Sequence, residues 1–431
     1  MRTTMISSPN VIVFFTDQQR WDTVGLHGHP LGLTPNFDRL AQAGMFVPNS
    51  FTCQPVCGPA RSALQTGLYP TTTGCFRNDI PLPPEQKTLA HHFAKGGYET
   101  SYIGKWHLAS REPVPPEQRG GYQHWLASNI LEFTSYAYDT TMFNAAGEAV
   151  KLPGYRVDAL TDAAIRYVAQ PRDKPYFLFL SFIEPHHQNE FDDYPAPVGY
   201  EERIREKMEL PPDLAMLGGS SSEHYPGYMG MVQRLDEALG RLVDTLISLK
   251  QLDNTVILFT SDHGCHFKTR NKEYKRSCHE ASIRVPTFFH GPGFMNRGPY
   301  EGLASLIDLP PTLLAAAGLP VPDEMQGRSI FRDSPLENES IFVQISESHV
   351  GRALRTRRWK YEVGGPELSG WDDMNGSAYV ETHLYDLEKD PYELDNLCRH
   401  GEFEDVRESL RTELLRRIAD AGEPLPTITP I

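Results

Sequence analysis

The stretch Val11-Ile12-Val13-Phe14-Phe15-Thr16-Asp17-Gln18 joins an uninterrupted apolar run to a carboxylate and a carboxamide. Consecutive Val, Ile and Phe residues without polar alternation are typical of a parallel strand that is buried on both faces. Runs of the same kind occur at 99–103, 176–183, 255–260 and 285–290. Helical periodicity over 156–169 and 228–250 separates some of them, so the pattern predicts βαβ units built around a parallel sheet.

The chain changes character at the polar segment 331–340. Beyond it, the sequence predicts a small antiparallel sheet and a terminal helix, at 352–363, 383–387 and 402–421. We therefore expect a large α/β domain over residues 1–340 and a small α+β subdomain over residues 341–431.

The composition limits the partners of the chain. Its 431 residues carry a net charge of −15, which disfavours nucleic acid and anionic membranes because both bind basic surfaces. No apolar stretch approaches the roughly 18–20 residues that span a bilayer. The N-terminal residues lack the pattern of a signal peptide, and six cysteines are too few for a dense disulfide framework, so we expect a cytoplasmic protein. A small anionic ester is the substrate class that this charge accommodates most easily.

Charged and imidazole side chains directly follow four of the predicted strands. The segments after these strands are Asp17-Gln18, Gly104-Lys105-Trp106-His107, Glu184-Pro185-His186-His187 and Ser261-Asp262-His263-Gly264. In open parallel sheets, ligands bind outside the carboxyl ends of the strands. Because four separate strand ends carry such groups, we predict one functional site at that edge of the sheet.

Two of these segments contain the ligand types of a divalent metal site. Asp17 with Gln18, and Asp262 with His263, supply carboxylate, carbonyl and imidazole groups. Carboxylate and amide oxygens suit a hard ion such as Ca²⁺ or Mg²⁺. Asp17 also fits the cap of a following helix, and Asp262 also fits a turn. For either pair alone, this structural role and metal binding are equally good interpretations. Together, on neighbouring strand ends, the two pairs favour metal binding.

The run Val56-Cys57-Gly58-Pro59-Ala60-Arg61, followed by Thr66-Gly67, is the most informative motif of the chain. Pro59 suits the first turn of a helix, which places Cys57 at a helix N-terminus. The partial positive charge of that terminus, with Arg61 one turn further along, favours an anion directly above the side chain of residue 57.

This run resembles the sulfatase signature, Cys-x-Pro-x-Arg followed by Thr-Gly. The resemblance covers most of the chain, from Asn10 through the strand-end segments, Lys275 and 280–286 to Leu384-Tyr385-Asp386-Leu387 and Asn396-Leu397. It implies the alkaline-phosphatase-like fold, a large mixed but mostly parallel sheet sandwiched by helices. It also implies that a formylglycine-generating or maturase enzyme oxidises Cys57 to formylglycine, an aldehyde whose hydrate is the nucleophile.

The resemblance assigns catalytic roles to five further residues. Arg61 matches the residue that holds the aldehyde hydrate, and Lys105 and Lys275 match the groups that clamp the sulfate. His107 matches the base that helps to expel sulfate, and His186 matches the group that faces the leaving-group oxygen. The cationic stretch around Lys275 and the loop histidines would otherwise be ordinary solvated or structural residues.

The resemblance also makes Asp17, Gln18, Asp262 and His263 the metal ligands, with modified Cys57 touching the ion. Many members of the family have a second Asp in place of Gln18 and an Asn in place of His263. The smaller anionic charge of this ligand set weakens the preference for Ca²⁺, so that Mg²⁺ and Mn²⁺ stay open.

The substrate class stays open between two kinds of ester. Gly58 and Ala60 replace the Ser or Thr and the Ser that are usual in the signature, and related phosphonate monoester and phosphodiester hydrolases tolerate such changes. Those enzymes tend to have a hydroxyl residue at the position of His107, so His107 and both lysines favour sulfate. We predict a hydrolase of a small aryl or carbohydrate sulfate. A phosphonate or phosphodiester hydrolase is the alternative, and a non-catalytic anion-binding protein is a third possibility.

Five residues are candidates for substrate contacts by analogy with the fold alone. They are Trp106, His187, His349, Arg352 and Trp371. No feature of the sequence fixes the oligomeric state.

Overall fold

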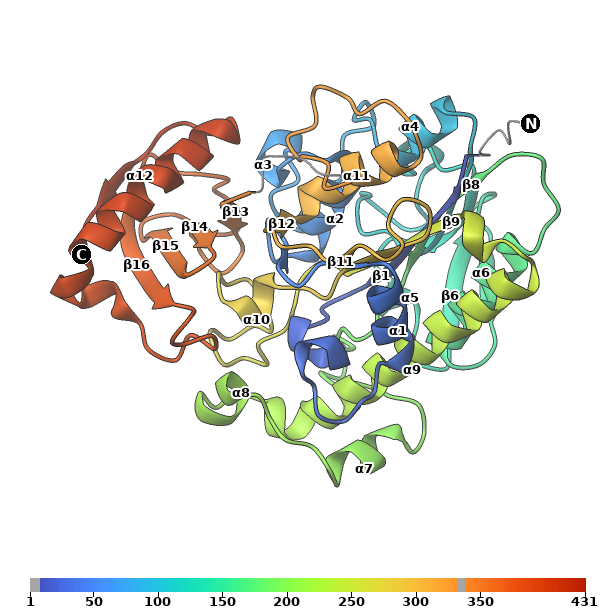
Figure 1. Cartoon of the computed structure of the whole chain (residues 1–431), viewed down its shortest axis with the longest axis horizontal. Coiled ribbons are helices and arrows are strands. Elements are labelled where there is room, and N and C mark those ends of the chain that lie inside the picture. Colours follow the sequence, from blue (N-terminus) through green and yellow to red (C-terminus); the bar gives the residue numbers. More distant parts are fainter. Residues whose placement is uncertain (1–7, 332–337) are drawn as a thin grey trace.

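The strand that begins at Asn10 lies in the middle of a ten-stranded sheet in the computed structural model, which describes residues 8–331 and 338–431 (Figure 1). Two predictions fall largely outside these ranges. One is the lack of a signal peptide at the N-terminus, and the other is the boundary segment 331–340, most of which is not described. Four strands of the sheet are parallel neighbours in the order β9-β1-β8-β4. Their bounds are β1 Asn10–Thr16, β4 Glu99–Lys105, β8 Tyr176–Ser181 and β9 Thr255–Ser261.

The outer strands of this sheet make it mixed. The complete order is β11-β2-β10-β9-β1-β8-β4-β5-β6-β7. The added strands are β2 Met45–Phe46, β5 His124–Ser128, β6 Thr140–Asn144, β7 Ala149–Leu152, β10 Phe288–His290 and β11 Gly298–Pro299. The strand predicted at 285–290 as part of the parallel core is wrong in direction and length, because β10 is short and antiparallel to β9. The predicted fold class is otherwise confirmed.

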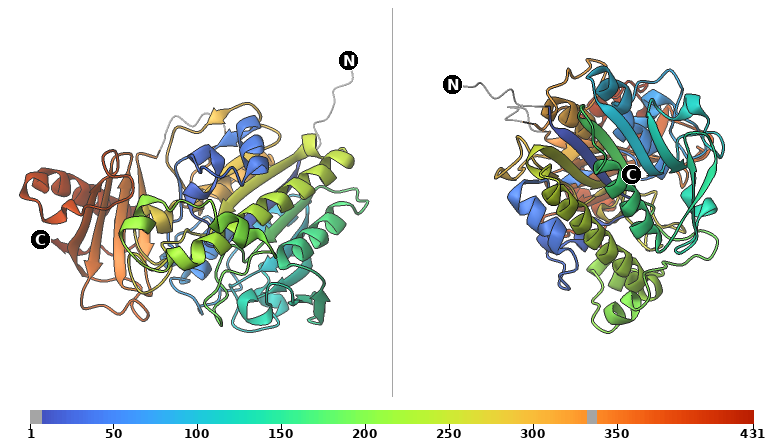
Figure 2. Two further views of the ribbon diagram at one scale, coloured as in Figure 1. Left: turned by 90° about the horizontal axis from the view of Figure 1, so that it is seen from below. Right: turned by 90° about the vertical axis from the view of Figure 1, so that its right-hand side faces the viewer.

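Helices cover both faces of the sheet, as the alternation along β1 requires (Figures 1 and 2). Val11, Val13 and Phe15 pack with the helices of one face, and Ile12 and Phe14 pack with those of the other. The first face holds α2 Cys57–Thr66, α4 Leu89–Lys95 and α11 Leu309–Ala316. The second holds α1 Pro35–Ala43, α6 Arg156–Val168 and α9 Ser221–Ser248. The helix predicted from residue 228 thus begins seven residues earlier, at Ser221.

The remaining helices are short and belong to loops at the rim of the sheet. They are α3 Pro70–Thr73, α5 Leu131–Thr134, α7 Tyr200–Arg205, α8 Pro212–Met216 and α10 Glu280–Ile283. Among the residues that the structure describes, no helix combines the length and the apolar character that a membrane crossing demands.

A second sheet, five-stranded within 338–431, lies beside the large one and is covered by helix α12 Glu404–Asp420 (Figure 1). Its strands are β13 Ser340–Ile345, β14 Val350–Thr356, β15 Trp359–Gly365, β16 Ala378–Asp386 and β17 Thr427–Thr429. The first four are antiparallel, whereas β17 pairs in parallel with β16. Phe342 and Leu354 of this sheet share a core with Cys53 and with Ala63 of α2. The C-terminal sheet therefore supports the helix that begins at Cys57.

Candidate active site

Cys57 is the first residue of α2, a helix whose residues are all buried. Val56 precedes it in extended conformation, and Gly67 ends the helix at a φ of 72°. The Gly58 amide donates to Asn78 Oδ1 at 2.9 Å, and a Cβ on Gly58 would lie only 3.0 Å from that oxygen. The replacement of Ser or Thr by Gly58 thus makes room for Asn78, a residue that the sequence did not point to.

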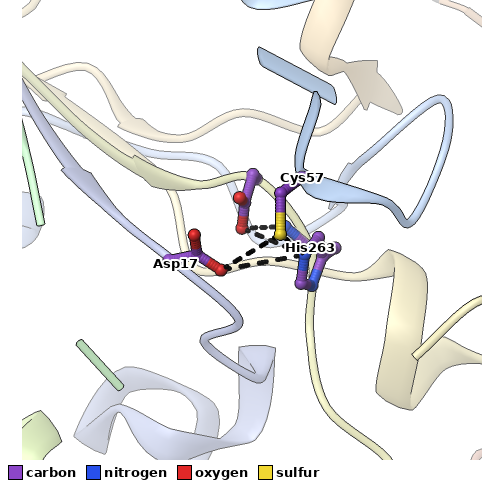
Figure 3. A group of neighbouring side chains, drawn as sticks. Asp17, Cys57 and His263 are labelled. Carbon is purple, nitrogen blue, oxygen red and sulfur yellow. Dashed lines mark hydrogen bonds and ion pairs between the residues drawn. The ribbon is translucent and has the colours of Figure 1, made fainter. Parts of the chain in front are cut away.

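Figure 3 shows Asp17 and His263 beside the sulfur of Cys57, which stands where the aldehyde would stand after oxidation. Cys57 Sγ lies 3.0 Å from Lys275 Nζ, 3.2 Å from His263 Nε2 and 3.6 Å from Asp17 Oδ1. Lys105 Nζ is 4.0 Å away. Burial alone would raise the pKa of the Cys57 thiol, but Lys105 and Lys275 hold that pKa well below its ordinary value.

Four ligand atoms of the predicted metal site lie within 4.8 Å of one another, one each from Asp17, Cys57, Asp262 and His263. Burial and the negative charge of Asp17 raise the pKa of Asp262 to about 6. Asp262 Oδ2 has no hydrogen-bond donor among the described residues. His263 Nδ1 lies 2.9 Å from the Gly264 carbonyl, which can only accept, so the lone pair is on Nε2 and faces the cluster. Two buried carboxylates and this imidazole fit a divalent cation.

Gln18 lies beside this cluster and turns its amide oxygen toward Lys275. Its backbone has a positive φ of 66°, and its amide N–H donates to Asp262 Oδ1 at 3.0 Å. The side-chain Nε2 donates to the Tyr194 hydroxyl at 3.2 Å, and Oε1 accepts from Lys275 Nζ at 3.3 Å. The amide oxygen therefore faces Lys275, whose Nζ also contacts Cys57 Sγ.

Arg61 contacts the carboxylates of both Asp17 and Asp262. Its guanidinium donates to Asp17 Oδ2 at 2.8 Å, and its Nε lies 3.4 Å from Asp262 Oδ2. The other terminal nitrogen donates to the Lys105 carbonyl and to Ser181 Oγ, both at 2.8 Å. In this structure Arg61 thus orients the two aspartates.

Lys105 forms a buried ion-pair network with two carboxylates. Its Nζ lies 2.8 Å from Asp17 Oδ2 and 3.0 Å from Glu132 Oε1. Burial alone would lower the pKa of Lys105, but Asp17 raises it well above its ordinary value. Glu132 was missed at the sequence level, although it follows β5 and so belongs to the same edge of the sheet.

His186 and Lys275 form a hydrogen bond in which Lys275 is the donor. His186 Nδ1 lies 2.6 Å from the His187 carbonyl, so Nδ1 carries the proton and Nε2 the lone pair. Lys275 Nζ, 2.9 Å away, donates to that lone pair. Burial and the charge of Lys275 lower the pKa of His186, so its imidazole is neutral near pH 7. The ammonium of Lys275 is therefore the group of this pair that holds a transferable proton.

A cavity of about 370 Å³ opens above Cys57. Its lining includes six residues predicted from the sequence, Cys57, His107, His186, His187, Lys275 and Trp371. His107 has a positive φ of 60°, and no hydrogen-bond partner for its Nδ1 exists among the described residues. His107 thus lines the cavity while its Nδ1 is buried and left without a partner by the described residues.

Three of the predicted substrate contacts do not line this cavity. The prediction for Trp106 is wrong, because its ring is fully buried and packs edge-on against Tyr102 and Trp125. The prediction for Arg352 is also wrong, because its buried guanidinium pairs with Glu423 at 2.8 Å. His349 instead contacts Glu362 at 3.0 Å. His187 and Trp371 do lie at the cavity.

Two solved structures share this fold at low sequence identity. One is a complex of a protein with its substrate D-glucosamine-2-N,6-O-disulfate, with a TM-score of 0.79 and 21% identity over 96% of this chain and 98% of the other. The other is the phosphonate monoester hydrolase of Agrobacterium radiobacter, with a TM-score of 0.70 and 23% identity over 96% of each chain. Both likenesses establish the fold alone.

The sequence itself places the chain in one family. An ulvan-active sulfatase of Formosa agariphila is 29% identical over 97% of this chain and 82% of the relative. The sulfatase family matches residues 9–319, which include every residue of the cluster around Cys57. The chain therefore belongs to the sulfatase family.

Proposed function

We propose that this sulfatase hydrolyses a small carbohydrate sulfate, with Cys57 converted to formylglycine and a divalent cation bound beside it. The observation that carries the proposal is the position of Cys57 Sγ, at the floor of the cavity within 4.0 Å of both Lys105 and Lys275. Two ammonium groups around one buried atom favour a transferring sulfuryl group, whose oxygens carry negative charge.

Asp17, Gln18, Asp262 and His263 would hold the cation. The oxygen ligands suit Ca²⁺, Mg²⁺ or Mn²⁺, whereas the imidazole of His263 is a softer ligand than an Asn or Asp oxygen and so weakens the preference for Ca²⁺. When bound, such a cation supplies charge stabilisation and lowers the pKa of a neighbouring hydroxyl. It would also neutralise the two buried carboxylates, which relieves the repulsion that raises the pKa of Asp262.

Formylglycine supplies a hydrate with two hydroxyls, one that attacks sulfur and a second that allows the sulfate to be expelled again. Lys105 and Lys275 hold the anionic group over residue 57, and Arg61 keeps Asp17 oriented. Lys275 donates a proton to the departing oxygen, either directly or through the adjacent His186. The free nitrogen of His107 then accepts the proton of the second hydroxyl. A formylglycine-generating or maturase enzyme is the partner that this chemistry requires.

The walls of the cavity support a carbohydrate as the organic part of the substrate. Asp79, Asn78 and Asn189 supply polar groups, and Phe133 and Trp371 supply apolar rings at the rim. Sugars bind through such a combination of hydrogen bonds and flat apolar surface. The named substrates of the relative from Formosa and of the disulfated glucosamine complex are also carbohydrates. An aryl sulfate is the alternative substrate for the same sulfate ester hydrolysis.

A phosphonate monoester hydrolase is the second candidate function. It is favoured by Gly58 and by the shared fold with the Agrobacterium enzyme. His107 argues against it, because it lines the cavity at the position where the sulfatase signature implies a base.

A substrate panel distinguishes these functions. Protein that is coexpressed with a formylglycine-generating enzyme is assayed with sulfated monosaccharides, an aryl sulfate and a phenyl phosphonate ester, each with Ca²⁺, Mg²⁺ or Mn²⁺. We expect kcat/KM for the best sugar sulfate to exceed that for the phosphonate by at least about 100-fold. The Cys57→Ala variant is the blank. Preference for the phosphonate would overturn the sulfate assignment, and equal activity of the blank would overturn both.

A further inference from the structure

A second group of metal-ligand side chains lies where the C-terminal sheet meets the large domain. Cys278 comes just before α10, Glu362 lies on β15 and His383 lies on β16 (Figure 1). One ligand atom from each lies within 4.8 Å of the other two. Glu362 and His383 are direct partners in the pairing of β15 with β16, so the strands themselves fix their proximity.

The chemistry of this group differs from that of the Asp17 cluster. A thiol, an imidazole and a single carboxylate form a borderline-soft ligand set, which Zn²⁺ binds in preference to Ca²⁺ or Mg²⁺. We propose that Cys278, Glu362 and His383 bind one Zn²⁺ ion, independently of the proposed active-site metal. With one thiolate and one carboxylate, the charge of the ion would be balanced.

The surroundings supply the supporting contacts that a zinc site needs. His349 Nε2 lies 3.0 Å from Glu362 Oε1, and Oε2, which accepts from Thr382 Oγ1 at 3.1 Å, is the oxygen that faces His383 and would contact the ion. Lys360 Nζ donates to the Cys278 carbonyl at 2.7 Å and fixes the backbone of that ligand. Cys278 and Glu362 are buried, whereas the side chain of His383 is 32% exposed and gives the ion a route of entry.

Binding requires a small movement and the release of a proton. His383 Nδ1 is 2.5 Å from Glu362 Oε2, whereas two ligand atoms on a tetrahedral zinc lie about 3.3 Å apart, so the ring must move by about 1 Å. Cys278 loses its Sγ proton to solvent, and the proton with which His383 Nδ1 contacts Glu362 moves to Nε2, which frees Nδ1 for the ion. Water completes the fourth position.

The site would connect the two halves of the molecule. Cys278 is three residues from Lys275, whose Nζ contacts Cys57 Sγ, whereas Glu362 and His383 belong to the C-terminal sheet. A zinc ion would therefore anchor the loop of Lys275 to that sheet.

Cobalt substitution tests the proposal in the Cys57→Ala background, which removes the thiol of the active site. Chelator-treated protein receives excess Ca²⁺ to fill the Asp17 cluster and then one equivalent of Co²⁺ or Zn²⁺. We expect a thiolate-to-cobalt charge-transfer band, retention of about one zinc per chain, and a rise of at least about 2 °C in Tm with zinc.

Two further variants and their matched controls locate the site. Adding Cys278→Ser or His383→Ala should abolish the band and the retained zinc, and His383→Ala keeps the test valid if the buried cysteine variant does not fold. Cys53→Ser and His400→Ala, which change the same residue types elsewhere, should leave both unchanged. A missing band in the Cys57→Ala protein, or a band that survives Cys278→Ser and His383→Ala, would overturn the proposal.

Discussion

Two groups of buried charges in this protein are built differently. Next to the C-terminal sheet, Lys360 Nζ contacts Glu280 at 3.0 Å and Glu393 at 2.8 Å, and Arg355 donates to both oxygens of Glu280 at 3.2 Å. Every side-chain nitrogen and oxygen of this group, which we call the structural cluster (Glu280, Arg355, Lys360 and Glu393), has a hydrogen-bond partner, if only the described residues are counted.

Around Cys57, the charges of the active-site cluster (Asp17, Arg61, Lys105, Glu132, Asp262 and Lys275) are equally buried but incompletely paired. Within the described part of the chain, Glu132 Oε2 has no hydrogen-bond partner, and Arg61 Nε and Asp262 Oδ2 face each other at 3.4 Å as an ion pair without a hydrogen bond. Burying an unpaired charged atom costs free energy, so such atoms persist where a ligand can satisfy them. The fully paired cluster lies away from the cavity, whereas the incompletely paired one lies at Cys57, which lines it, so we interpret its open positions as places for substrate and cation.

A matched pair of lysine variants gives the largest expected difference between the clusters. Lys105 and Lys360 are both fully buried. Lys105→Met should lower kcat/KM by about 1,000-fold because it removes charge stabilisation of the transferring group. Lys360→Met should destabilise the fold by about 3 kcal/mol but leave kcat/KM of the folded protein within about threefold. Equal loss of kcat/KM in the two variants would remove the distinction between the clusters.

The direction of the Lys275–His186 hydrogen bond predicts a dependence on the leaving group. Lys275→Ala removes the proton donor, so kcat for an alkyl or sugar sulfate should fall by about 100-fold or more. An aryl sulfate with an acidic phenol needs less protonation and should lose much less. The measurement is kcat for both esters with each protein. A uniform loss for the two esters would assign Lys275 to sulfate binding alone.

The rim of the cavity should influence binding rather than chemistry. Trp371 is 42% exposed and lines the cavity, and the Arg77 guanidinium lies 4.6 Å from its ring centroid. Trp371→Ala should raise KM for a sugar sulfate about tenfold with kcat nearly constant. Tyr138, 51% exposed and not part of the cavity lining, is the control, and Tyr138→Ala should change neither constant. An unchanged KM in the Trp371 variant would place the sugar elsewhere.

The smallest effect concerns stability beside the structural cluster. Burial alone would lower the pKa of His349, but its hydrogen bond to Glu362 raises it above the ordinary 6.5. Because the pKa of His349 is higher in the folded than in the unfolded protein, protonated His349 stabilises the fold below pH 6.5. This stabilisation is lost as the pH rises through the pKa of His349 in the folded protein.

Chelator-treated wild-type and His349→Ala protein should therefore differ by about 0.5 kcal/mol in free energy of unfolding at low pH, a figure reduced for the exposure of the ring. Urea denaturation below and above the folded-state pKa measures this difference. A difference that stays constant or grows toward high pH would contradict the assignment of the charge.

The residues at the strand ends could be predicted from the sequence. Each buried strand is a continuous apolar run, and the polar residue at its end is its neighbour in the chain. The error at Trp106 arose because this residue, which directly follows β4 between Lys105 and His107, packs into the core against Tyr102. Glu132 was missed because β5 mixes polar and apolar residues and gave no strand signal.

Other features depend on partners that are distant in the sequence. Arg352 is held by Glu423, and Cys278 meets Glu362 and His383 only when the C-terminal sheet packs against the large domain. No local pattern encodes such pairs, so only the three-dimensional structure could reveal them.

The mass of the peptide that carries Cys57 tests the central claim most directly. Trypsin releases residues 40–61 from the active protein, a peptide that contains both Cys53 and Cys57. We predict a loss of about 18 Da at Cys57 and alkylation of Cys53 alone, since an aldehyde has no thiol to alkylate. Two alkylated cysteines in fully active protein would contradict the account.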